Sequence, residues 1–199
     1  MAKAAQGAIA CIGWGSLVWD PRDLPLRGTW QNDGPLLPLE FVRESGAKAG
    51  TRGDRITLVI HPAAPPVRTY WALLDVPDLD TARRRLAIRE GIRKRWDKRD
   101  KDIGYVDVRD SGRRVAEAEV VRLWASGLDL SGVVWTNLPP KFNGTNGAVP
   151  TAEDVIAFLQ NLHEDKRGAA EGYVRHAPPQ IDTPYRRLIE ERLGWRGRS

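Results

Sequence analysis

Short apolar runs, each bounded by proline, glycine or aspartate, recur through the first 75 residues. They cover 9–12, 39–43, 55–60 and 69–74. Their β-branched, aromatic and aliphatic residues, ended by turn-forming residues, are typical of strands. The sequence therefore predicts strands of one mostly antiparallel sheet, with further strands at 103–108 and 133–135.

A helical period of apolar residues replaces these runs in much of the second half. It covers 79–90, 115–128 and 153–162, and segments 167–173 and 184–193 are also predicted to be helical. Asp78 and Gly91 are placed to start and stop the first of these helices. Strands followed by helices predict an α+β fold with a small, barrel-like sheet.

The length and composition indicate a single domain over 1–199. The chain has 199 residues, of which 41% are hydrophobic, and no Pro/Gly/Ser-rich linker divides it. We expect a core over about 8–136 and a helical C-terminal extension over about 150–195. No uninterrupted apolar stretch approaches the ~20 residues that span a bilayer. The expected location is cytoplasmic, with no membrane partner, and the oligomeric state is left open.

The charge balance raises nucleic-acid binding as a function. The formal net charge is +5, the pI is about 9.6, and eight tryptophans are available for stacking. The basic residues are, however, interleaved with acidic ones, as in 80–102, which is typical of a solvated surface of mixed charge. We therefore expect no nucleic-acid partner, and a basic nucleic-acid-binding module is the weakest alternative.

Two residue types argue against metal and thiol chemistry. His61, His163 and His176 have no metal-ligand spacing, and the chain has a single cysteine. That cysteine, Cys11, lies inside the first apolar run, where a thiol usually behaves as a small buried hydrophobe rather than a nucleophile. No metal or other cofactor is expected.

The segment after the first predicted strand has the most distinctive pattern in the chain. Two glycines flank a tryptophan, and a serine and a leucine follow: Gly13, Trp14, Gly15, Ser16 and Leu17. Paired glycines directly after a buried strand suggest that backbone N–H groups are exposed to hold a polar group. A tight turn without a ligand is the alternative reading.

Glu90 is the carboxylate that the helical pattern places on an unexpected face. A step of about 100° per residue puts it on the stripe of Leu79, Ala82 and Leu86, with Ile88 pointing away. Burial and the negative end of the helix dipole both favour a protonated carboxyl, as an acid/base catalyst requires. Alternatively, Glu90 pairs with Arg93, Arg89 or Arg43, or lies in solvent where the helix ends.

Arg43 continues a row of strand residues that are predicted to face inward. Strand alternation places it with Leu39 and Phe41, where its guanidinium can hold a substrate carboxylate, as can that of Arg52. A strand-end arginine in water is the alternative. The long polar loop 136–147 is interpreted either as a ligand wall or as a disordered surface loop.

The strand leading into Gly13-Trp14-Gly15-Ser16-Leu17 resembles the Tyr-Gly-Ser turn of the gamma-glutamylcyclotransferase-like superfamily, with Trp14 in place of the usual tyrosine. Arg89-Glu90-Gly91 is similar to the later acidic motif of that family. The resemblance covers residues 8–108 and is closest to a bacterial subfamily of unsettled substrate. It implies that the turn binds a γ-glutamyl group and that Glu90 is the catalytic acid/base.

These observations lead to one main hypothesis and two alternatives. The main one is an enzyme that releases 5-oxoproline from a γ-glutamyl amine or peptide, with Glu90 catalytic and Gly13, Trp14, Gly15, Ser16, Leu17 and Arg43 binding the substrate. The first alternative is a non-catalytic protein that binds a small anion on the same scaffold. The nucleic-acid module is the second.

Overall fold

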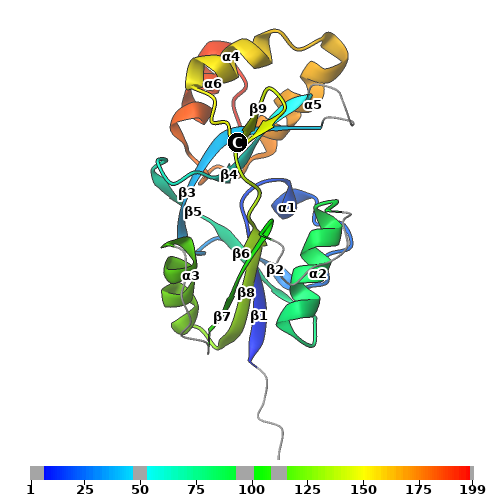
Figure 1. Cartoon of the computed structure of the whole chain (residues 1–199), viewed down its shortest axis with the longest axis vertical. Helices are drawn as coiled ribbons and strands as arrows, with labels where there is room; N and C mark the ends of the chain where they lie inside the picture. Colours follow the sequence, from blue (N-terminus) through cyan, green and yellow to red (C-terminus); the bar gives the residue numbers. More distant parts are fainter. Residues whose placement is uncertain (1–6, 47–52, 93–100, 109–115, 198–199) are drawn as a thin grey trace, which may run out of the picture. The chain divides into compact units, whose positions relative to one another are not determined.

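The computed structural model describes residues 7–46, 53–92, 101–108 and 116–197, which form the helices and strands of Figure 1. The chain divides into two compact units, and each is described by itself. The first unit comprises Met1–Gly13, Asp20–Leu37 and Arg68–Asn137. The second comprises Trp14–Trp19, Pro38–Val67 and Leu138–Ser199.

The first unit is built on a five-stranded mixed sheet of order β2-β6-β1-β8-β7. Its strands are β1 (Ala8–Gly13), β2 (Leu26–Gln31), β6 (Tyr70–Leu74), β7 (Ile103–Asp107) and β8 (Leu130–Thr136). The central strand β1 runs antiparallel to β6 and parallel to β8, so that Cys11 lies opposite both Ala72 and Val134. This position explains why the first apolar run is almost fully buried.

Two helices, α2 (Leu79–Arg89) and α3 (Ala116–Ser126), lie on opposite faces of this sheet (Figure 1). On the α2 face, Gly132 leaves room for Leu79, because a Cβ at Gly132 would come within 2.9 Å of the leucine Cδ1. On the α3 face, the Trp71 and Trp124 rings meet edge to face at 5.4 Å. The sheet therefore has an apolar layer on each side.

The second unit contains the second sheet, of order β10-β9-β3-β4, with β5 also paired to β3. Its strands are β3 (Leu36–Ser45), β4 (Arg55–Ile60), β5 (Pro66–Arg68), β9 (Lys141–Phe142) and β10 (Thr145–Asn146). Its helices are α1 (Ser16–Trp19), α4 (Ala152–Gln160), α5 (Glu164–His176) and α6 (Pro184–Leu193). Helices α4 and α5 pack on β4, and α4 also packs on α6.

The helix ends follow from local sequence. Thr151 and Asp154 form a reciprocal capping box at the start of α4, which satisfies two backbone N–H groups there. Asp78 caps α2 through the Thr81 N–H, and Gly91 takes a positive φ of 70° directly after its C-cap. Gly194 ends α6 in the left-handed conformation that glycine adopts without strain.

The predicted α+β class is confirmed, but the prediction of one sheet is wrong, since the described residues form two. Neither of these sheets is closed into a barrel. The strand missed in the first unit, β2, is an edge strand whose side chains are mostly exposed, so it lacks the apolar run by which the others were predicted. A single domain stays a prediction.

Candidate functional site

Glu90 lies at the C-cap of α2, on the side of the helix that faces the sheet. Ala82 and Leu86 on the same stripe are fully buried, whereas Ile88 is 63% exposed, as the helical period predicts. The Glu90 side chain is 15% exposed, and its Oε1 accepts a 2.7 Å hydrogen bond from Arg89 Nη1. The pairing of Glu90 with Arg89, one of the predicted alternatives, is therefore present.

Arg89 holds this carboxylate with a buried guanidinium. Its side chain is 5% exposed, and its Nη2 also donates to the Asp20 carbonyl oxygen at 2.6 Å. Arg22 Nη1 in turn donates to the Arg89 carbonyl oxygen at 3.5 Å. A charge-assisted bond from a buried arginine fixes the position of the Glu90 carboxylate.

The negative charge of Glu90 affects a residue of strand β1, Cys11. Burial raises the pKa of the Cys11 thiol, and the negative charge of Glu90 raises that pKa further, while Arg89 acts in the opposite direction. Glu90 therefore lies near Cys11 of β1. Cys11 is two residues before Gly13, which ends the strand. The same effects keep Cys11 as a neutral thiol, which disfavours its use as a nucleophile.

The turn after β1 enters the second unit at Trp14 and forms the single helical turn α1. Trp14 is 5% exposed, and its indole Nε1 donates to the Leu58 carbonyl oxygen at 3.2 Å, while Leu17 is a core residue. The Val18 N–H donates to the Gly15 carbonyl oxygen at 2.9 Å. Within the described part of the chain, no acceptor is found for the N–H groups of Gly15 and Leu17.

The Tyr173 side chain lies so close to residue 15 that only a glycine fits there, and Tyr173 was not among the predicted site residues. A Cβ at Gly15 would lie 2.5 Å from the hydroxyl oxygen of Tyr173 in α5. The Tyr173 ring meets Trp19 at 5.4 Å and Phe41 at 6.3 Å, both edge to face. In the sequence, the only sign of this contact is Gly15 itself, 158 positions before Tyr173. A single glycine does not reveal which residue packs against it.

The prediction that Arg43 shares a face with Leu39 and Phe41 is wrong. The register between β3 and β4 shifts between Phe41 and Arg43, as at a β-bulge, and this shift reverses the alternation. Arg43 Nη1 donates to the Pro139 carbonyl oxygen at 2.6 Å and to Asn146 Oδ1 at 3.5 Å. Arg43 thus holds the loop that includes β9 and β10, and Arg52 lies outside the described residues.

A second buried carboxylate, Glu40, lies in the second unit and was not predicted. Its residue is 2% exposed, and Oε1 accepts bonds from the Phe41 N–H at 2.8 Å and the Thr183 hydroxyl at 2.5 Å. Oε2 accepts from the Tyr185 N–H at 3.2 Å. Burial raises the pKa of Glu40, and these hydrogen bonds act in the opposite direction.

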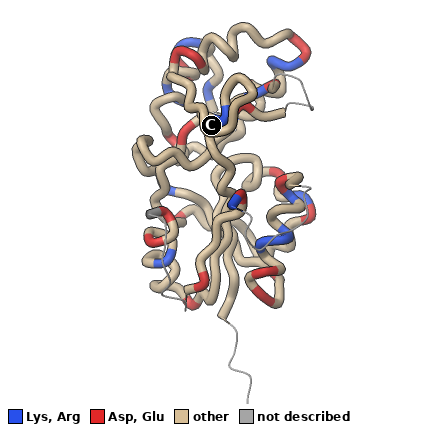
Figure 2. Tube along the Cα trace, in the orientation of Figure 1, with Lys and Arg blue, Asp and Glu red and all other residues tan. Residues whose placement is uncertain are grey.

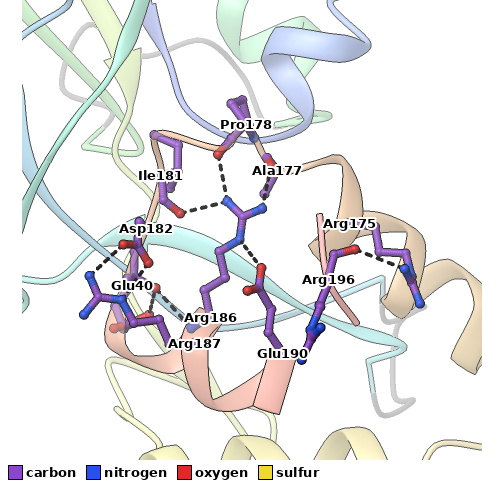
Figure 3. A network of polar contacts seen from close by, with 11 residues as sticks. Glu40, Arg175, Ala177, Pro178, Ile181, Asp182, Arg186, Arg187, Glu190 and Arg196 are labelled. Atoms are coloured by element: carbon purple, nitrogen blue, oxygen red, sulfur yellow. Dashed lines mark hydrogen bonds and ion pairs between the residues drawn. The ribbon is translucent and has the colours of Figure 1, made fainter. Parts of the chain in front are cut away.

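The residues around the start of α6 form one polar network (Figure 3). Next to Glu40, the buried Arg186 guanidinium donates to the carbonyl oxygens of Ala177, Pro178 and Ile181 at 2.7–3.0 Å and to Glu190 at 3.0 Å. Because all these acceptors belong to the segment 177–190, the network is a structural one.

The first unit also has a cleft, of about 720 Å³, next to the N-terminal end of α2, whereas Glu90 lies at the C-terminal end. Its wall includes Arg83, whose guanidinium stacks on the Tyr105 ring at 3.8 Å and pairs with Asp80 at 3.3 Å. None of the predicted site residues lines this cleft.

Helix α2 carries one acidic residue, Asp80, and four arginines, and both charges are coloured along it in Figure 2, while residues 93–100 of the predicted mixed-charge segment lie outside the described ranges. No group of three or more His, Cys, Asp or Glu side chains in the described ranges is arranged to hold a metal ion. Among the helices that the structure describes, none combines the length and the apolar character needed to cross a membrane.

The chain fits no protein-family model, and no curated protein is significantly similar to it.

Proposed function

We propose that the chain is a gamma-glutamylcyclotransferase-like enzyme that releases 5-oxoproline from a γ-glutamyl amine or peptide, with Glu90 as the acid/base. The proposal rests on the resemblance of Gly13–Leu17 and Arg89-Glu90-Gly91 to the two motifs of that family. The observation that carries it furthest is the position of Glu90, held on the sheet side of α2 near β1.

The reaction needs one group that accepts and returns a proton. The substrate's α-amine attacks its own γ-carbonyl carbon, which forms the ring C–N bond, and the bond from that carbon to the leaving nitrogen breaks. Glu90 takes a proton from the attacking amine and delivers one to the leaving nitrogen, so the protons balance. Because no electrons are transferred, the reaction calls for no redox cofactor.

Arg89 supports the step in which Glu90 acts as a base. Its guanidinium holds Glu90 Oε1 in place before the amine arrives, and a carboxylate has a second oxygen to accept the proton. The resemblance gives the turn residues Gly13–Leu17 the task of holding the γ-glutamyl group. The N–H groups of Gly15 and Leu17 are suitable donors for a carbonyl oxygen that gains negative charge.

The test is a screen of γ-glutamyl amines and dipeptides for 5-oxoproline formation, with the wild type and Glu90→Gln. We expect release by the wild type and a loss of about 10²–10⁴-fold in Glu90→Gln, the usual contribution of a general acid/base. The matched control is Glu119→Gln, which disrupts the exposed Arg122–Glu119 pair on α3 and should leave turnover unchanged.

Two results would replace this proposal. Turnover retained by Glu90→Gln removes the glutamate mechanism. A wild type that is thermally stabilised by γ-glutamyl compounds, but releases no 5-oxoproline, is a binding protein on this scaffold.

A further inference from the structure

The hairpin of β9 and β10 contains two Asn-Gly sequences, Asn143-Gly144 and Asn146-Gly147, and all four residues are exposed. Asparagine is a chemically labile residue, and it is most labile before glycine. The backbone nitrogen of the next residue attacks the side-chain amide carbon, and glycine has no Cβ to obstruct the approach. The two asparagines are alike in this respect, so a difference between them must come from the fold.

Asn143 and Gly144 are the two central residues of the hairpin turn. Phe142 pairs with Thr145 across the turn, and the φ angles of Asn143 and Gly144 are 48° and 78°. Positive φ at both central positions is what a type I′ turn requires, and Asn-Gly is a preferred pair for it. In such a turn the N–H groups of the central residues lie outside the hydrogen-bonded ladder.

The two glycine nitrogens differ in one respect. Within the described ranges the Gly144 N–H has no hydrogen-bond acceptor, whereas the Gly147 N–H donates to the Pro140 carbonyl oxygen at 2.7 Å. Packing does not separate them, because a Cβ at either glycine would meet open space. Asn143 has contacts of its own, but the difference between the two sites lies in the glycine nitrogens. The Gly147 nitrogen must release its bond before it can attack, and the Gly144 nitrogen has no such bond to release.

We infer that Asn143 is a site of non-enzymatic deamidation and that Asn146 is protected by the fold. The Gly144 nitrogen forms a bond to Asn143 Cγ and loses its proton, and the side-chain nitrogen leaves as ammonia, which gives a cyclic imide. Water then opens the imide at either carbonyl carbon and gives aspartate or isoaspartate at position 143. The reaction consumes water, releases ammonia and transfers no electrons, and it is independent of the proposed function.

The test incubates the folded wild-type protein at mildly alkaline pH and follows each asparagine by peptide mapping with mass spectrometry. This measurement separates the aspartate and isoaspartate products from the original peptide. We expect product at Asn143 to form about tenfold faster than product at Asn146, the ratio that corresponds to opening one backbone hydrogen bond.

The matched control is the same protein unfolded in concentrated urea. The bond from the Gly147 N–H to Pro140 is then absent, so the two Asn-Gly sequences should react at similar rates. Two variants assign the products in the folded protein. Asn143→Gln should remove the fast product and leave the slow one unchanged, and Asn146→Gln should remove only the slow one.

Four outcomes would overturn the inference. Equal rates at Asn143 and Asn146 in the folded protein would show that the Gly147 bond gives no protection. A faster reaction at Asn146 would reverse the assignment. An absence of reaction at both sites in the folded protein, with reaction in urea, would show that the turn itself protects Asn143. A ratio that persists in urea would show that the flanking sequence, and not the fold, sets the difference.

Discussion

Two carboxylates of this chain, Glu40 on β3 and Glu90 at the end of α2, are both shielded from water but are held in different ways. Glu40 uses both oxygens to accept bonds from Phe41, Thr183 and Tyr185, all neutral donors of its own unit. Glu90 is bound through Oε1 by the neighbouring Arg89. Burial alone therefore does not indicate catalysis: both oxygens of Glu40 are engaged by neutral groups of the fold, whereas Glu90 is positioned by a charged partner.

The largest effect on stability should come from Glu40→Ala. The substitution leaves the Phe41 and Tyr185 N–H groups and the Thr183 hydroxyl without their acceptor in a buried place. We expect the free energy of unfolding to fall by about 3 kcal/mol, measured by urea denaturation. Glu191→Ala, at an exposed position of helix α6, is the control and should change the free energy of unfolding by less than about 0.5 kcal/mol. A similar loss in both variants would contradict a structural role specific to Glu40.

Arg89→Met should have a smaller effect on stability and a clear one on activity. Without the guanidinium, Glu90 keeps its shielding but loses the partner that positions its carboxylate. We expect the free energy of unfolding to fall by about 2 kcal/mol and the rate of 5-oxoproline release to fall by about tenfold or more. The control Arg122→Met removes the exposed partner of Glu119 and should change neither. An unchanged release rate in Arg89→Met would show that Arg89 does not position the catalytic base.

The sequence predicted most elements of the fold but not how they are grouped. The apolar runs identified β1, β3, β4 and β6 because those strands are largely buried, and helical periodicity identified α2 with Ile88 pointing outward. Pairing between strands is not encoded in a local pattern, so the division into two sheets was missed. The shift that turns Arg43 away from Phe41 inserts one residue, and alternation cannot reveal it.

The candidate site was predictable only where one local pattern sufficed. The helical stripe placed Glu90 correctly on the sheet side of α2, and the paired glycines marked the turn. Glu40 and Tyr173 were not predicted, because each acquires its environment from residues more than 100 positions away, Thr183 for the first and Gly15 for the second.

The smallest expected effect is on the pH dependence of stability, in which the wild type and Glu40→Gln should differ. Its folded pKa lies above the ordinary 4.5, so the folded protein retains this proton to higher pH than the unfolded chain does. The contribution of this group to stability is therefore complete below about pH 4.5 and is lost as the pH rises through the raised pKa. Glu40→Gln, which cannot ionise, should lose less stability than the wild type over that rise in urea titrations. Parallel curves for the two proteins would contradict the raised pKa.

The most direct test of the account is the rate of 5-oxoproline release by Glu90→Gln beside that of Glu40→Gln, each checked for folding by its thermal melt. We predict that Glu90→Gln remains folded and loses release by about 10²-fold or more, whereas Glu40→Gln retains release while folded. Release by Glu90→Gln at the wild-type rate would contradict the assignment of Glu90 as the acid/base.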